Sequence, residues 1–258
     1  MRKAAKERMR EGPTQKPLRI LVIPDIHGDF ELLSQVLEKI QWDAVDAIVC
    51  PGDFTNLYTT PPEFNQLDIA ELVIEKLLAP GKPLLCVPGN HDPYELLEVL
   101  DDYGISCHGR IRTLQGVHFA GFGGALTPFN TPFEPPEEET RAALEAVAAK
   151  AEDPLVLITH APPKNTALDR ISSGEHVGSE AIRSIIALRK PLLALSAHIQ
   201  EARGTDAIGP TTLFYPGALV DGFYGFVTID PAKRTVHCEQ KTFPIPARKP
   251  PLLIDQSL

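Results

Sequence analysis

The chain has 258 residues, 43% of them hydrophobic and 23% charged, which is an ordinary composition for a globular protein. No apolar run approaches the roughly 20 residues that a membrane helix needs, so we do not expect a membrane protein. The formal net charge is −9, and an acidic body repels nucleic-acid backbones, so nucleic acid is not expected as the main partner.

The first predicted segment is a flexible basic tail over residues 1–17, because seven Lys or Arg face only two Glu within the first 19 residues. This tail lacks the apolar stretch of a secretory signal, which favours a cytoplasmic protein. The four cysteines form no C-x-x-C pair, as expected in a reducing compartment.

From residue 18 onward, short apolar runs alternate with segments of helical period, the pattern of parallel β-α-β units. The first helical stripe follows Asp29, a predicted N-cap. We predict further helices near residues 63–78, 137–151 and 179–188. Predicted strands cover residues 18–24, 47–50, 84–87, 117–121, 155–159 and 192–197.

Three more β-rich segments, at residues 211–215, 223–229 and 235–241, are expected to form a hairpin or meander. They complete one domain over residues 18–241, and a Pro-rich tail follows over residues 242–258. The expected fold is α/β, in the α+β four-layer form: two packed mixed β-sheets flanked by helices.

Polar residues that can bind metals follow five of the predicted strands where each strand ends. Because ligands of open α/β sheets bind beyond the carboxyl ends of the strands, we expect these residues to converge on one cleft. A mixture of oxygen and imidazole ligands suits Mn²⁺, Fe or Zn²⁺ better than Mg²⁺ or Ca²⁺. The residues are Asp25, His27, Asp53, Asn90, His91, Asp92, His160, His198 and Gln200.

The ordered set of motifs resembles the calcineurin-like metallophosphoesterases, and the stretches at residues 160–163, 174–179 and 201–204 look like their small bacterial and archaeal branch. The motifs are Asp-x-His at residues 25–27, Gly-Asp at 52–53, Gly-Asn-His-Asp at 89–92, then His160 and a late pair at 198–200. The Gly-Asp-x-x-Asp-Arg-Gly signature of Ser/Thr protein phosphatases is missing after Asp53, so protein dephosphorylation is not expected.

The resemblance implies a centre of two divalent metal ions, with Mn²⁺ the first choice and Fe, Zn²⁺, Co²⁺ or Ni²⁺ as alternatives. It implies a first ion held by Asp25, His27 and Asp53. It implies a second ion held by Asp53, Asn90, His160 and His198. Such a pair of ions can deprotonate a water and orient a phosphorus atom for in-line attack.

Two neighbouring residues receive catalytic roles from the same resemblance. His91 would protonate or stabilise the leaving-group oxygen. Asp92 would either orient the His91 ring or cap the helix that follows.

The last motif departs from the family pattern, because Gln200 stands where a second histidine is usual. Glutamine is neutral and offers one amide oxygen, a weaker ligand than imidazole for a borderline metal. Three outcomes stay open: Gln200 binds the first ion through oxygen, a water takes its place, or the first site is only partly occupied.

Other residues are candidates for substrate contact. His176 precedes a predicted helix start, where free backbone N–H groups can hold an anion. Arg170 and Arg203 could contact a substrate phosphate, with a rim salt bridge as the alternative. Phe129 and Phe133 either face an aromatic leaving group or pack their Pro-rich loop.

The sequence therefore predicts a phosphoesterase that hydrolyses small phosphomonoesters or phosphodiesters, with nucleotides among the candidates. The alternative is a catalytically weak or inactive regulator that binds phosphate or nucleotides, as an impaired first metal site would allow. A repair-type nuclease is disfavoured by the acidic body. The expected partner is a small phosphoester, and a homo-oligomer is left open.

Overall fold

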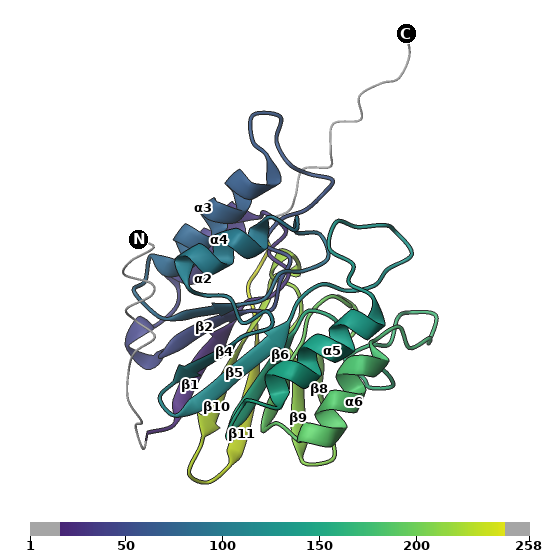
Figure 1. Ribbon diagram of the computed structural model, residues 1–258. Coiled ribbons are helices and arrows are strands. Elements are labelled where there is room, and N and C mark those ends of the chain that lie inside the picture. The colour runs from purple at the N-terminus through teal and green to yellow at the C-terminus, as the bar shows by residue number, and fades with distance from the viewer. Residues whose placement is uncertain (1–15, 246–258) are drawn as a thin grey trace.

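The structure, a computed structural model, describes residues 16–245 (Figure 1). Most of the predicted basic tail and most of the predicted Pro-rich tail lie outside the described residues. None of the described helices is both long and apolar enough to cross a membrane.

Two mixed β-sheets form the centre of the fold. The first has the order β11-β10-β1-β2-β3, in which β1, β2 and β3 run parallel. Its strands are β1 (Leu18–Val22), β2 (Ala47–Cys50), β3 (Leu84–Cys86), β10 (Phe223–Asp230) and β11 (Thr235–Thr242). The second has the order β4-β5-β6-β7-β9-β8, in which β5, β6, β7 and β9 run parallel. Its strands are β4 (Ile111–Leu114), β5 (Val117–Phe122), β6 (Leu155–Thr159), β7 (Leu193–Leu195), β8 (Gly204–Ile208) and β9 (Thr211–Tyr215).

The sheets pack face to face, and helices cover both outer faces, which gives the predicted four layers (Figure 1). The first sheet is covered by α2 (Phe30–Glu38), α3 (Gln66–Leu78) and α4 (Leu96–Tyr103). The second is covered by α5 (Glu137–Ala148) and α6 (Glu180–Arg189). Residues that alternate along β1, such as Ile20 and Leu21, enter different clusters, because successive side chains of a strand point to opposite faces.

Local signals set the helix starts. Asp29 caps α2 as predicted, since its carboxylate accepts a hydrogen bond from the backbone N–H of Leu32 at 3.0 Å. Ser179 caps α6 in the same way. Asn65 and Asp68 form a capping box that begins α3 three residues later than predicted.

The predicted hairpin or meander of the last three strands is confirmed for the last two and wrong for the first. Only β10 and β11 pair with each other, while β9 lies in the second sheet between β7 and β8. The reason is burial on both faces of β9: Phe214 packs between the sheets, and Leu213 and Tyr215 pack under the helices. Burial on both faces is typical of a strand in the parallel part of a sheet that is covered on both sides, which is where β9 lies beside β7.

Candidate metal centre

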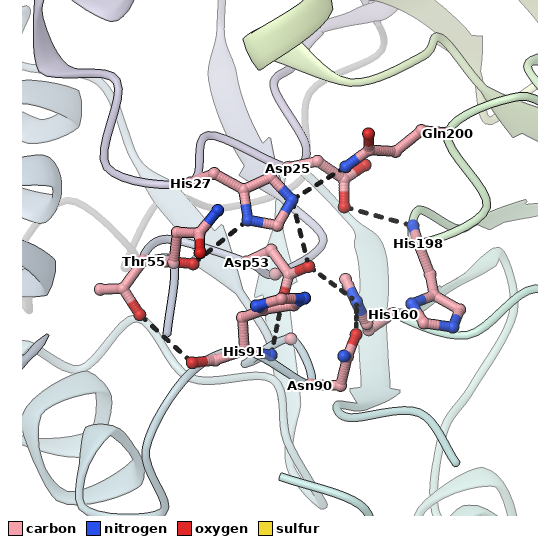
Figure 2. A network of polar contacts seen from close by, with 12 residues as sticks. Asp25, His27, Asp53, Thr55, Asn90, His91, His160, His198 and Gln200 are labelled. Atoms are coloured by element: carbon pink, nitrogen blue, oxygen red, sulfur yellow. Dashed lines mark hydrogen bonds and ion pairs between the residues drawn. The ribbon is translucent and has the colours of Figure 1, made fainter. Parts of the chain in front are cut away.

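The residues that follow strands β1, β2, β3, β6 and β7 lie together in one polar cluster, as predicted (Figure 2). The backbone N–H of Asp25 donates to the carbonyl of Gly52 at 3.1 Å, which joins the first two strand ends. The His160 ring places Nδ1 2.9 Å from the carbonyl of Pro51, and the backbone N–H of His198 donates to Asp25 Oδ1 at 3.2 Å. These contacts connect residues of both sheets.

Four of these residues have a left-handed backbone although none is glycine: Asp25 at φ 49°, His27 at φ 50°, Asp53 at φ 55° and His198 at φ 77°. L-residues avoid this region, and each such position costs on the order of 1–3 kcal/mol. Such strain concentrates at functional sites, because the surrounding structure must hold it in place.

Two glycines permit the close approach of β2 and β3. A Cβ on Gly89 would lie 2.0 Å from Asp53 Oδ1, and a Cβ on Gly52 would lie 2.6 Å from the backbone nitrogen of Gly89. Any larger residue would push the two strand ends apart. The glycines of both motifs therefore bring Asp53 next to the loop that carries Asn90.

Asp25, His27 and Asp53 form a group whose potential ligand atoms all lie within 4.8 Å of one another. Both carboxylates are buried, and within residues 16–245 no Lys or Arg forms an ion pair with either of them. Burial raises the pKa of Asp25. Burial would also raise the pKa of Asp53, but the histidines, His160 first, outweigh it and lower that pKa. Paired buried carboxylates that have only imidazoles, and no Lys or Arg, as charged partners suit a divalent cation.

A second group surrounds His160. Its Nε2 lies 2.9 Å from Asn90 Oδ1 and 3.4 Å from Asp53 Oδ2. The ring centroids of His160 and His198 are 5.1 Å apart. Burial would lower the pKa of His160, but the charge of Asp53 outweighs it and raises the pKa to about 9. Burial lowers the pKa of His198 to about 3. Amide oxygen, carboxylate and imidazole are donor types that divalent transition metals accept.

Two supporting residues escaped the sequence analysis. The hydroxyl of Tyr215 donates to Asp25 Oδ2 at 2.7 Å, and Asn90 Nδ2 donates to Thr131 Oγ1 at 3.0 Å, which leaves Asn90 Oδ1 toward His160. Tyr215 ends β9, and correct placement of that strand would have found it.

Gln200 lies at the first group, where its Nε2 is 2.9 Å from His27 Nε2 (Figure 2). His27 Nδ1 is 3.3 Å from the carbonyl of Thr55, so Nδ1 carries the proton and Nε2 offers a lone pair. The Gln200 side chain thus lies beside His27 of the first group, with its amide nitrogen turned toward the imidazole.

His91 lines the cleft above the two groups. Its ring meets the His27 ring edge-on at 5.0 Å between centroids and the Tyr58 ring at 5.8 Å. Its backbone N–H donates to Asp53 Oδ1 at 2.9 Å, which connects the third strand end to the candidate bridging carboxylate. Burial lowers the pKa of His91.

Asp92 does neither of the two things expected of it. Its carboxylate accepts backbone hydrogen bonds from Phe54 at 3.2 Å, Thr55 at 2.9 Å and Gly89 at 2.8 Å, and the N-cap of α4 is another residue. Within the described chain, Nδ1 of His91 has no hydrogen-bond partner. Burial, followed by the charge of Asp53, raises the pKa of Asp92 to about 6. Asp92 therefore holds the loops after β2 and β3 together. The expectation that it orients the His91 ring or caps the following helix is wrong.

Of the three residues predicted to contact substrate, only Arg203 lines the cleft. Arg203 lines the cleft of about 870 Å³ that opens from the metal centre, with Cζ 4.2 Å from the centroid of the Phe223 ring. His176 and Arg170 are not among the residues that line it. His176 Nδ1 lies 2.7 Å from Oδ1 of the fully buried Asp169, a contact that stabilises the loop before α6.

The comparisons with known proteins agree with this geometry. Residues 18–202 match the family described as calcineurin-like phosphoesterase. An uncharacterized protein of Methanocaldococcus jannaschii is 32% identical over 206 residues, which are 78% of this chain and 88% of that protein.

Two solved structures show the same fold. One is the protein TT1561 of Thermus thermophilus, at 21% identity and a TM-score of 0.64 over 86% of this chain and 98% of that one. The other is a dimetal phosphatase from Danio rerio, at 13% identity and a TM-score of 0.58 over 89% of this chain and all of that one. The chain therefore belongs to the calcineurin-like phosphoesterase family.

Proposed function

We propose that this protein hydrolyses small phosphomonoesters or phosphodiesters with the help of two divalent metal ions, Mn²⁺ first among them. The observation that carries the proposal is the group of Asp25, His27 and Asp53, two buried carboxylates and an imidazole that converge with no described Lys or Arg paired to them. When bound, such ions supply an activated water and neutralise charge on the phosphoryl oxygens.

The residues of the chain would divide the work as follows. Asp25, His27 and Asp53 would hold the first ion, with Gln200 beside them, and Asp53 would be shared with the second. Asn90, His160 and His198 would complete that second site. His91, on the cleft wall, would donate a hydrogen bond or a proton to the leaving-group oxygen.

The test is turnover of p-nitrophenyl phosphate and bis-p-nitrophenyl phosphate by protein loaded with Mn²⁺, Fe²⁺, Zn²⁺, Co²⁺ or Ni²⁺. We expect hydrolysis of at least one ester, and we expect Asp53→Asn to lower kcat by about 100-fold or more, because it removes a charge shared by both ions. The control is Asp43→Asn, because Asp43 is exposed and does not line the cleft, so kcat should stay unchanged. If the wild type were inactive with every metal and Gln200→His restored turnover, native catalysis would be ruled out.

A second candidate function is a regulator that binds phosphate or nucleotides without hydrolysing them. The observation that favours it is the amide nitrogen of Gln200, which faces the lone pair of His27 Nε2 where a metal ligand is expected. Metal analysis separates the two functions. About one ion per chain, phosphate binding and no turnover would favour the regulator.

A further inference from the structure

The cleft that opens from the metal centre is larger than a phosphate needs. It measures about 870 Å³, and its floor contains His27, Asp53, Asn90, His91 and His198. It is also lined by residues of two loops, one joining β5 to α5 and the other joining β6 to α6. The space therefore extends from the position of a phosphate toward whatever is esterified to it.

One wall of this outer part is apolar. Leu126 and Phe129 on the first loop and Val177 on the second all line the cleft and are 50%, 72% and 44% exposed. We call these three residues the apolar wall. Large hydrophobic side chains that face a concave space beside polar groups are typical of a ligand site.

The loop that carries Phe129 is held in place by hydrogen bonds to its own residues and to the metal centre. The backbone N–H of Phe129 donates to Thr127 Oγ1 at 3.1 Å, and that hydroxyl donates to Glu134 Oε1 at 2.5 Å. The backbone N–H of Phe133 donates to the carbonyl of Asn90 at 3.0 Å. These hydrogen bonds fix the backbone that carries the exposed ring of Phe129.

The two phenylalanines of this loop have different surroundings. Phe133 is buried, and its ring stacks on Tyr94 with 4.2 Å between centroids. Phe133 therefore packs the loop, which was one of the two roles that the sequence left open. Phe129 is the ring left for a ligand.

The charges of the outer cleft do not suit a second phosphate. Apart from the metal-centre residues, the charged residues that line it are Glu201, Arg203 and Asp221. Both carboxylate oxygens of Glu201 already accept hydrogen bonds from Ser172, at 3.0 Å and 2.7 Å. One guanidinium among two carboxylates gives no net attraction for a polyphosphate, so an uncharged group fits better.

We propose that the apolar wall binds a flat, uncharged aromatic group esterified to the phosphate, either an aryl ring or a nucleobase. The Phe129 ring would contact the ligand ring stacked or edge-on, and Leu126 and Val177 would cover its sides. The inference rests on the proposed function, because the metal centre anchors the phosphate end.

The primary test is binding of two phosphonates that are not hydrolysed, measured by calorimetry on the Mn²⁺-loaded protein. Benzylphosphonate and methylphosphonate share the anion and differ by one ring. We expect benzylphosphonate to bind about tenfold more tightly, and Phe129→Ala to remove most of that difference while leaving methylphosphonate unchanged. The matched control is Phe64→Ala, because Phe64 is 45% exposed and does not line the cleft.

The outcomes separate this inference from the function beneath it. Equal binding of the two phosphonates, or a difference that survives in Phe129→Ala, would overturn the aromatic site while methylphosphonate binding still supported a phosphate centre. Failure of both phosphonates to bind would overturn the proposed function and this inference with it.

Two pairs of substrates then distinguish an aryl ring from a nucleobase. Benzyl phosphate is compared with propyl phosphate, and adenosine 5′-monophosphate with ribose 5-phosphate, since each pair differs mainly by a ring. A KM in Phe129→Ala that rises severalfold for the ring-bearing member of one pair identifies the source of the ring. An unchanged KM in both pairs would contradict the proposal.

Discussion

At the scale of single residues, Gln200 has the clearest chemical consequence for this site. Its Nε2 lies 2.9 Å from His27 Nε2, beside the proposed first site, and its amide oxygen would be a weaker metal ligand than imidazole. We expect Gln200→His to raise affinity at the weaker of the two metal sites by about one order of magnitude.

The measurement is a calorimetric titration of metal-stripped protein with Mn²⁺. The control is Gln200→Ala, which should weaken the site further if the amide oxygen binds the ion and leave it unchanged if a water does. Identical Mn²⁺ isotherms for the wild type and Gln200→His would contradict the prediction.

His108 gives a prediction about stability and pH that does not involve the metal centre. Its Nδ1 accepts a hydrogen bond from the backbone N–H of Gly123 at 3.0 Å, and burial lowers its pKa to about 4. An unfolded histidine titrates near 6.5, so the unfolded chain takes up this proton first as the pH falls. The free energy of unfolding should therefore decrease between pH 6.5 and 4, by at most about 3 kcal/mol from this residue.

The variant His108→Asn separates this contribution from others. The Oδ1 of the new asparagine can accept the same hydrogen bond, but the asparagine side chain does not titrate. The variant also loses the stacking of the imidazole on Phe122, whose ring centroid lies 4.1 Å from that of His108. We expect lower stability at pH 7 but a flatter decrease toward pH 4.5 in urea unfolding. A pH dependence parallel to that of the wild type would contradict this assignment.

At the scale of elements, the loop between β5 and α5 connects the cleft wall to the metal centre. Thr131 Oγ1 accepts a hydrogen bond from Asn90 Nδ2 and donates one to Glu134 Oε1 at 2.5 Å. Because its proton is directed to Glu134, Thr131 binds the amide nitrogen of Asn90, and the amide oxygen points toward His160. Residues that orient a ligand commonly change metal affinity by about 10- to 100-fold when they are replaced.

We therefore expect Thr131→Val, which keeps the shape and removes the hydroxyl, to lower Mn²⁺ affinity by about tenfold. Thr131→Ser retains the hydroxyl and serves as the control. Mn²⁺ titration measures the affinity, and urea unfolding checks that any stability change stays near the ~1 kcal/mol of a lost hydrogen bond. Equal affinities in the two variants would show that Thr131 does not orient Asn90.

The elements also show what the sequence could and could not predict. Strands such as β1 and β6 were found because each is a continuous apolar run ended by a polar ligand-like residue. β8 and β4 were missed, because Gly204–Ile208 and Ile111–Leu114 lie at sheet edges and have few apolar residues. β9 forms a hairpin with the missed β8 and runs parallel to β7, so without β8 its place in the second sheet was missed as well. Tyr215 at the end of β9, the hydroxyl donor to Asp25, was missed for the same reason.

At the scale of the whole molecule, the proposed metal centre joins residues of both sheets, so its charge balance should affect global stability. Asp25 and Asp53 are buried carboxylates, and without a cation the described partners of their charge are histidines. A ligand that binds only the folded state stabilises it by about 2.7 kcal/mol per site at 100 times its Kd. For a chain of this size, such a gain corresponds to a Tm rise of about 5–10 °C.

Calorimetric melting of the metal-stripped protein with and without Mn²⁺ measures this effect. We expect the rise in the wild type and almost none in Asp53→Asn, because that substitution weakens both proposed sites at once. Mg²⁺ should stabilise less than Mn²⁺ at equal concentration, since imidazole ligands suit it poorly. If the Tm of Asp53→Asn rose as much as that of the wild type, the ions would be binding elsewhere, and the junction of the two sheets would not be the metal centre.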